Sequence, residues 1–128
     1  MPRAMCHCGA VVLDVPAMPT TVFECNCSIC RRLGALWAYY PPKDVVVLSG
    51  LGRTRSYVWG DGTVEYHTCE TCGCTSHWRP LDERQYAVMG VNARLLDELQ
   101  PGTTRVQRVD NGGSGCFWIG SAGSEGKG

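Results

Sequence analysis

The chain has 128 residues, the length of a single domain with a modest hydrophobic core. Twelve Lys and Arg residues balance twelve Asp and Glu residues, so the formal net charge is zero. A neutral chain has no long-range field that gathers nucleic acid or an anionic membrane, and we expect neither as a partner. Hydrophobic residues make up 44% of the chain, which is typical of a folded protein and argues against a disordered one.

The longest uninterrupted apolar run, residues 35–40, is far shorter than the roughly 20 residues that a membrane-spanning helix requires. Residues 1–8 contain no apolar segment of the kind found in secretory signals. The nine cysteines form an odd number and are clustered, which in a reducing compartment indicates metal ligands more often than disulfides. We therefore expect a cytoplasmic protein.

In chain order, the sequence predicts many short strands and two short helices. Apolar or β-branched runs bounded by turn residues predict strands at residues 11–15, 21–24, 36–40, 45–48, 53–59, 63–68, 86–89 and 104–109. The Asp-Gly pair within residues 60–62 favours a hairpin between two of these strands. Residues 28–33 and 95–100 are the two predicted helices. Together the elements predict a mainly β domain over residues 1–119, followed by a flexible Gly/Ser-rich tail over residues 120–128.

Three cysteine clusters interrupt these elements. They are residues 6–9 (Cys-His-Cys-Gly), 25–30 (Cys-Asn-Cys-Ser-Ile-Cys) and 69–74 (Cys-Glu-Thr-Cys-Gly-Cys), and Cys116 stands alone. Cys-x-Cys beside a strand places two sulfurs on one face, and Cys-x-x-Cys-Gly forms a tight turn whose glycine lets the backbone fold back. Two such half-sites from distant parts of a chain can close a tetrahedral Zn²⁺ site, which contributes folding free energy directly.

The middle cluster offers three candidate ligands, Cys25, Cys27 and Cys30, within six residues. Three protein ligands leave one tetrahedral position open, which is the feature that distinguishes catalytic zinc sites from structural ones. An open position can take water or a substrate thiol in its thiolate form. The spacing leaves the pairing of clusters open, since Cys74 could also supply a fourth sulfur to this trio. An iron–sulfur cluster is an alternative occupant.

Four ordered motifs, at residues 6–9, 25–32, 67–73 and 92–97, make the chain resemble the glutathione-dependent formaldehyde-activating enzyme family, also called the centromere-protein-V domain family. The resemblance implies an Mss4-like fold of small β-sheets with one or two short helices. It also implies two zinc ions per chain. The residues that would hold the structural zinc are Cys6, Cys8, Cys69 and Cys72, and those that would hold the catalytic, open zinc are Cys25, Cys27 and Cys30.

The activity implied by the resemblance is that of a carbon–sulfur lyase, which joins glutathione and formaldehyde to S-hydroxymethylglutathione or reverses that step. Glutathione or a similar small thiol is then the expected partner. Arg31 and Arg32 follow the middle cluster and are predicted to offset its negative charge or to bind substrate carboxylates. Asn92 and Arg94 match a family motif and are further substrate-binding candidates, and His67 is a candidate to orient the site. The alternative function is a non-catalytic zinc module that binds a protein.

Overall fold

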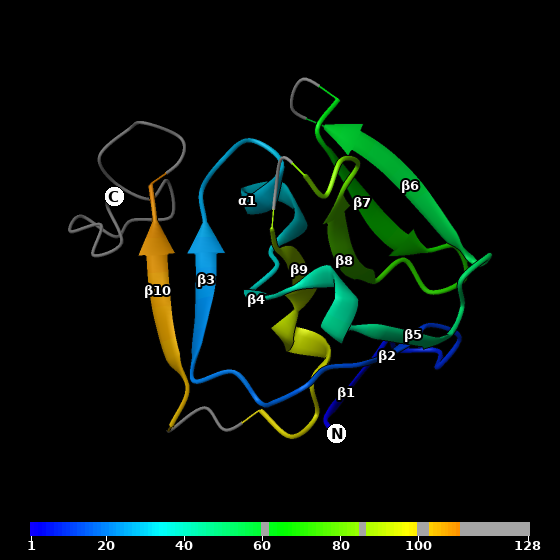
Figure 1. Cartoon of the computed structure of the whole chain (residues 1–128), viewed down its shortest axis with the longest axis horizontal. Helices are drawn as coiled ribbons and strands as arrows, with labels where there is room; N and C mark the ends of the chain where they lie inside the picture. The colour runs from blue at the N-terminus through cyan, green and yellow to red at the C-terminus, as the bar shows by residue number, and fades with distance from the viewer. Residues whose placement is uncertain (60–61, 85–86, 100–102, 111–128) are drawn as a thin grey trace.

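The computed structural model describes residues 1–59, 62–84, 87–99 and 103–110. Its strands form a small and a large sheet (Figure 1). The small sheet has the order β1-β2-β5 and is antiparallel, with β1 at Arg3–Met5, β2 at Val12–Asp14 and β5 at Val46–Ser49.

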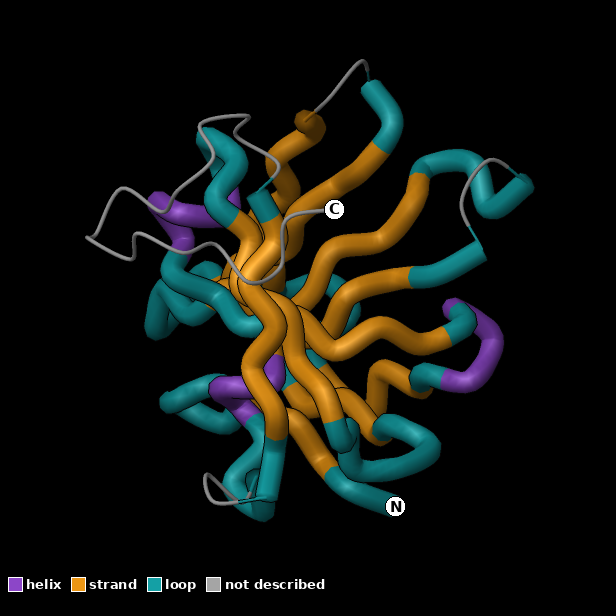
Figure 2. The backbone as a smooth tube through the Cα atoms, turned by 90° about the vertical axis from the view of Figure 1, so that its left-hand side faces the viewer, coloured by secondary structure: helices purple, strands orange, loops and turns teal. Residues whose placement is uncertain are grey.

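The large sheet has seven strands in the order β10-β3-β4-β9-β8-β7-β6. Its strands are β3 (Thr21–Cys25), β4 (Trp37–Tyr40), β6 (Thr54–Trp59), β7 (Val64–Cys69), β8 (Thr75–Pro80), β9 (Met89–Asn92) and β10 (Arg105–Val109). All neighbours pair antiparallel except β10 and β3, which are parallel. Within the residues that the structure describes, helical structure is confined to α1 (Cys30–Leu33) and two 3₁₀ turns, η1 (Pro42–Asp44) and η2 (Ala93–Leu95). Figure 2 shows these helical segments as short pieces around the strands.

The large sheet buries apolar side chains on both faces. On one face, Val22, Ala38 and Val91 pack with Ala4 and Leu13 of the small sheet, and this contact forms the main core. On the other face lies a second apolar cluster; its buried members are Cys25, Cys30, Ala35, Trp37 and Tyr66. Because side chains alternate along a strand, each central strand contributes to both clusters. Cys25 and Cys30 are thereby held at fixed positions on one face of the large sheet.

The prediction of a mainly β domain is confirmed, with corrections in detail. Two strands, β1 and β8, were not predicted. The helix predicted at residues 95–100 is wrong, because the described part of that segment holds only the end of η2 and a turn. The predicted strand at residues 86–89 begins only at Met89, and the predicted helix at residues 28–33 narrows to Cys30–Leu33.

Strands β6 and β7 form the predicted hairpin, although residues 60–61 of its turn lie outside the described residues. The predicted tail at residues 120–128 and Cys116 also lie outside them, so the domain boundary at residue 119 stays a prediction. In the described part of the chain, no helix is long and apolar enough to cross a membrane.

Candidate metal centres

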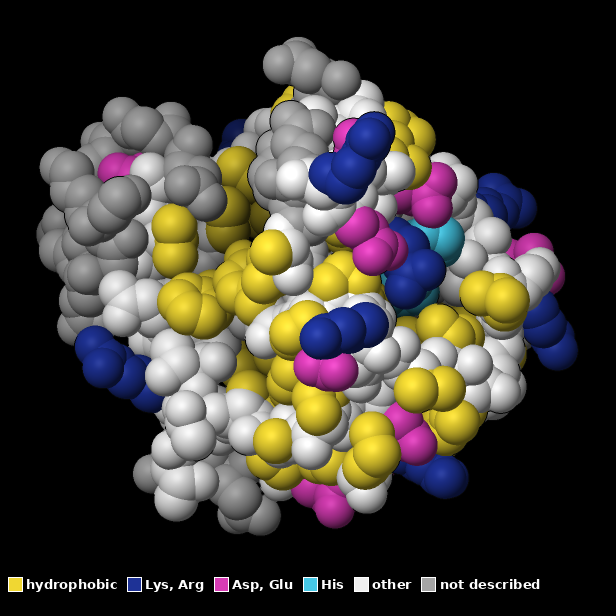
Figure 3. Space-filling view, in the orientation of Figure 1, with side chains coloured by type: hydrophobic (Ala, Val, Ile, Leu, Met, Phe, Trp, Pro, Cys, Tyr) yellow, Lys and Arg dark blue, Asp and Glu magenta, His cyan; other side chains and the backbone are white. Residues whose placement is uncertain are grey.

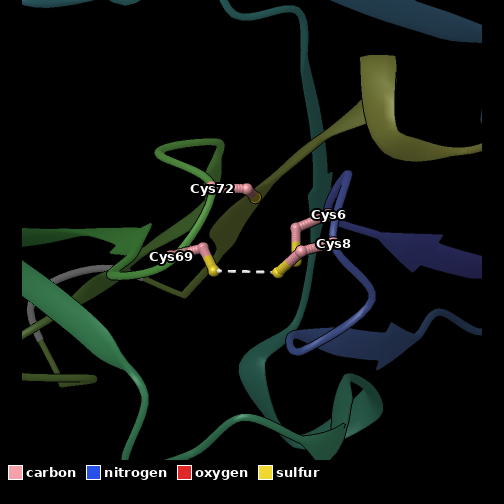
Figure 4. A group of neighbouring side chains, drawn as sticks. All are labelled: Cys6, Cys8, Cys69 and Cys72. Carbon is pink, nitrogen blue, oxygen red and sulfur yellow. Dashed lines mark hydrogen bonds between the residues drawn. The ribbon is translucent and has the colours of Figure 1, made fainter.

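The first cysteine group joins the N-terminal strands to the β7–β8 turn. Cys6 and Cys8 follow β1, Cys69 ends β7, and Cys72 lies in the turn before β8. The four sulfur atoms lie within 4.8 Å of one another, with Sγ–Sγ distances of 3.7 Å from Cys8 to both Cys6 and Cys69 (Figure 4). Four sulfurs from two distant segments, gathered at one point, fit a tetrahedral Zn²⁺ ion.

The backbone around this group points amide donors at the sulfurs. The glycine of each cluster turns the chain with a positive φ, 83° at Gly9 and 81° at Gly73. The amide of Val11 donates to Cys6 Sγ at 3.2 Å. Hydrogen bonds from the backbone at Cys74 and Cys8 lower the pKa of the Cys72 thiol to about 5. Amides that favour the thiolate form suit a metal ligand, because the metal binds the deprotonated sulfur.

Cys74 lies beside this first group and not beside the second. It packs against the cluster formed by Cys6, Val11 and Cys69. Its sulfur is not among the four that lie within 4.8 Å of one another. The alternative in which Cys74 completes the trio of Cys25, Cys27 and Cys30 is therefore not the arrangement that the chain adopts.

The second group is built where β3 runs into α1. Cys25 ends β3, Cys30 is the first residue of α1, and Cys27 lies in the loop between them. Their sulfurs lie within 4.8 Å of one another. Amides of the loop hold the sulfurs in place, since Cys27 N donates to Cys25 Sγ and Cys30 N to Cys27 Sγ, each at 3.4 Å. Among the described residues, no fourth Cys, His, Asp or Glu ligand joins this trio.

Three thiols at this separation cannot ionise independently. Hydrogen bonds from the Cys25 and Cys30 thiols lower the pKa of the Cys27 thiol, whereas hydrogen bonds to Cys25 and Cys27, together with burial, raise the pKa of Cys30. Formation of the first thiolate is thus favoured, whereas formation of a second one is opposed by repulsion between like charges. A divalent cation removes that opposition, so the donor set fits a zinc ion that holds all three as thiolates.

An aromatic wall covers the second group on the same face of the large sheet. We use this name for Trp37, Tyr39, Tyr66 and Trp78. Ring centroids lie 5.9 Å apart for Trp37–Tyr66, 6.5 Å for Tyr66–Trp78 and 6.1 Å for Tyr39–Trp78. Tyr66 Oη lies 3.6 Å from Cys30 Sγ, and the buried indole Nε1 of Trp37 has no hydrogen-bond partner in the described part of the chain. The wall therefore brings two polar N–H or O–H groups into the apolar cluster that contains the sulfurs.

Replacing Gly90 with alanine tests how tightly this wall is packed. Gly90 pairs with Trp78 across β9 and β8, and a Cβ at Gly90 would lie 2.1 Å from Trp78 Nε1. We expect Gly90→Ala to displace the indole and to lower the free energy of unfolding by about 1–3 kcal/mol. Urea unfolding followed by tryptophan fluorescence measures both effects. Gly52→Ala is the control, because a Cβ there meets nothing within 4 Å; equal losses in the two variants would contradict the close packing.

The two arginines predicted to serve the second group lie on α1, directly after Cys30. Arg32 is exposed, and its guanidinium donates to the backbone carbonyl of Ser28 at 2.8 Å. Arg31 is half-buried, and its amide donates to the carbonyl of Cys27. Both positive charges are thus carried by the helix that begins with Cys30, a member of the trio. Their contact with a substrate stays a prediction.

Asn92 and Arg94 hold backbone segments together around η2. The buried Asn92 amide donates to the carbonyl of Thr75 at 2.8 Å, and its oxygen accepts from the amides of Arg94 and Leu36. The exposed Arg94 donates to the carbonyl of Gly34, the residue that ends α1. These contacts connect β8, β9 and the segment between α1 and β4, and Arg94 holds the residue that caps α1. Substrate binding by either stays a prediction.

His67 lies on the opposite face of β7 from the second cysteine group. Its neighbour Tyr66 is the residue that reaches Cys30, and side chains alternate along the strand. His67 instead faces the small sheet, on the same side of β7 as Cys69. Tyr66 is thus the contact that sequence reasoning missed. Alternation limits the candidates to every second residue of β7, but it does not show which of the two sets faces the trio.

The fold and the two groups of gathered sulfurs define a small β protein with two candidate metal centres. The sequence profile of the glutathione-dependent formaldehyde-activating enzyme family matches residues 1–109. The structure is also similar to the crystal structure of a Rhodobacter sphaeroides protein, a structural-genomics target, with a TM-score of 0.68 and 31% sequence identity. That similarity covers 78% of this chain and 92% of the other. The chain belongs to the glutathione-dependent formaldehyde-activating enzyme family.

Proposed function

We propose that this protein is a zinc-dependent carbon–sulfur lyase that joins glutathione and formaldehyde to S-hydroxymethylglutathione, or cleaves that adduct. Membership of the family supports a reaction of glutathione with formaldehyde. The observation that carries the finer proposal is the trio of Cys25, Cys27 and Cys30, whose sulfurs lie within 4.8 Å of one another without a fourth ligand in the described part of the chain. Three ligands leave a coordination position for a substrate thiol.

In this proposal the two cysteine groups have different roles, one structural and one catalytic. Cys6, Cys8, Cys69 and Cys72 hold a structural zinc, since four sulfurs saturate a tetrahedral ion and join the small sheet to the β7–β8 turn. Cys25, Cys27 and Cys30 hold the catalytic zinc. When bound, that metal would favour the thiolate form of the substrate thiol and polarise an aldehyde oxygen.

In the forward reaction, the glutathione sulfur forms a bond to the formaldehyde carbon, and the thiol proton ends on the former carbonyl oxygen. The protein's own groups hold the reactants and balance charge. Three thiolates and one dication carry a net charge of −1, which the positive side chains of Arg31 and Arg32 on α1 offset. The Tyr66 hydroxyl, against Cys30 Sγ, can donate a hydrogen bond to that sulfur, and the aromatic wall keeps water from one side of the trio.

The test combines metal content with exchange kinetics. We expect two zinc ions per chain, calorimetric binding of glutathione at millimolar concentration or below, and faster exchange of ¹³C-formaldehyde with glutathione by NMR than without protein. S-methylglutathione, which has no free thiol, is the matched control and should not stimulate exchange. A protein that holds zinc but neither binds glutathione nor exceeds the spontaneous rate would overturn the lyase and favour the non-catalytic module.

A further inference from the structure

A separate cavity of about 230 Å³ lies between the two sheets, away from the second cysteine group. Val11 and Val47, beside and within the small sheet, supply an apolar side. The polar side is formed by β7 and β8, through Glu65, His67 and Arg79 among others. Figure 3 shows histidine side chains gathered with basic and acidic side chains on the part of the molecule where these strands lie. Such a mixture of apolar and convergent polar groups is typical of small-molecule sites.

The cavity is independent of the trio because of strand alternation. Tyr66 and Trp78 belong to the aromatic wall, whereas Glu65, His67 and Arg79, at the odd-numbered positions of β7 and β8, line the cavity on the opposite face. A ligand in this cavity therefore meets no sulfur of the second group, and the inference does not rest on the proposed lyase reaction.

The polar side is preorganised by hydrogen bonds. His67 Nδ1 lies 2.8 Å from Thr54 Oγ1, and His67 Nε2 lies 2.6 Å from Glu65 Oε1. His77 stacks on His67 with ring centroids 4.5 Å apart and an interplanar angle of 3°. Burial lowers the pKa of His77 to about 3, so this ring is neutral at pH 7. Glu65 and both imidazoles therefore have partners before any ligand enters.

Arg79 is the exception. Arg79 is paired with Glu65 across the β7–β8 ladder, but the Glu65 carboxylate contacts His67 Nε2 instead. Within the described residues, Arg79 forms no ion pair. Its buried Nε has no hydrogen-bond partner there, and its Nη2 reaches only the sulfur of Met89 at 3.9 Å. A buried guanidinium donor without an acceptor costs free energy, so an acceptor at this place would stabilise the protein.

We propose that this cavity binds a small monocarboxylate, with Arg79 as the residue that takes its carboxylate. The planar guanidinium fork matches a carboxylate in a bidentate arrangement. The side formed by Val11 and Val47 suits a short alkyl chain, and the volume is below the roughly 300–1,000 Å³ of drug-sized pockets. The Glu65 carboxylate lines the same cavity and repels a second negative charge, which disfavours phosphate.

The test titrates butyrate into the zinc-loaded full-length protein and follows the imidazole NMR signals of its three histidines. We expect saturable shifts of the His67 and His77 signals and none of the His7 signal. Butyramide, which has the same shape without the charge, and inorganic phosphate should shift neither. No shift with butyrate, or equal binding of butyramide or phosphate, would overturn the proposal without any mutation.

Variants then locate the site. Arg79→Gln should weaken butyrate binding at least about tenfold, because a charge-assisted pair is lost. Arg79→Lys should keep part of the affinity. Arg55→Gln is the matched control, since Arg55 is exposed on β6 and does not line the cavity. Cys27→Ser should bind butyrate as the wild type does. Unchanged affinity in Arg79→Gln, or loss of binding in Cys27→Ser, would overturn the assignment to this cavity.

Discussion

Cys72→Ser is expected to lower the free energy of unfolding by more than about 3 kcal/mol, enough to leave much of the chain unfolded at room temperature. The serine removes one of four sulfurs that lie within 4.8 Å of one another and join the small sheet to the β7–β8 turn. A small domain relies on such a link because its core alone contributes little net stability. Circular dichroism melts, with zinc measured on the same samples, check the result.

The neighbouring Cys74→Ser is the matched control for this substitution. It makes the same chemical change two residues further along, on a sulfur that packs beside the group without joining it. We expect a loss of less than about 1 kcal/mol and an unchanged zinc content. Equal destabilisation by the two variants would show that Cys74 is a ligand and would contradict the proposed set of four.

The strands that could be predicted are those whose sequence pattern itself indicates which side chains are buried. Residues 63–68 and 104–109 alternate or carry β-branched side chains, and they form β7 and β10 within a residue or two. Strand β8 has the sequence Thr-Ser-His-Trp-Arg-Pro, and two of its polar residues, His77 and Arg79, line a cavity. A pattern rule assigns such residues to a loop. Strand β1 has only three residues, too few for any periodicity.

Within the candidate sites, spacing predicted the cysteines but not the residues around them. Cys-x-x-Cys and Cys-x-Cys constrain their sulfurs locally, so each half-site could be anticipated from a single segment. The pairing of residues 6–8 with residues 69–72 could not, and it was implied only by the family resemblance. The contact of Tyr66 with Cys30 joins residues 36 positions apart, and it depends on which face of β7 meets α1. That strand is half-buried on both faces, so the pattern of hydrophobic residues does not show which face of β7 meets the trio. His67 was therefore as good a candidate as Tyr66 until the pairing of the strands was known.

Cys27→Ser is expected to reduce exchange of formaldehyde with glutathione more than about 100-fold while the protein stays folded. Loss of one thiolate weakens the site where the substrate thiol is proposed to bind, and metal-assisted stabilisation is worth several kcal/mol in such reactions. Cys27 is the informative position because it is half-buried in a loop. Cys25 and Cys30 are buried against Trp37 and Tyr66, so replacing them would also disturb packing.

The control for this variant is Ser28→Ala, which changes the adjacent exposed side chain of the same loop and should leave the exchange rate unchanged. Thermal melts of both variants separate chemistry from folding, and the zinc content of Cys27→Ser should fall from two ions to about one. Full activity in Cys27→Ser would remove the trio from the reaction. A melt lowered as far as that of Cys72→Ser would mean that both groups are structural, because a site that only serves the substrate contributes little to the stability of the sheets around it.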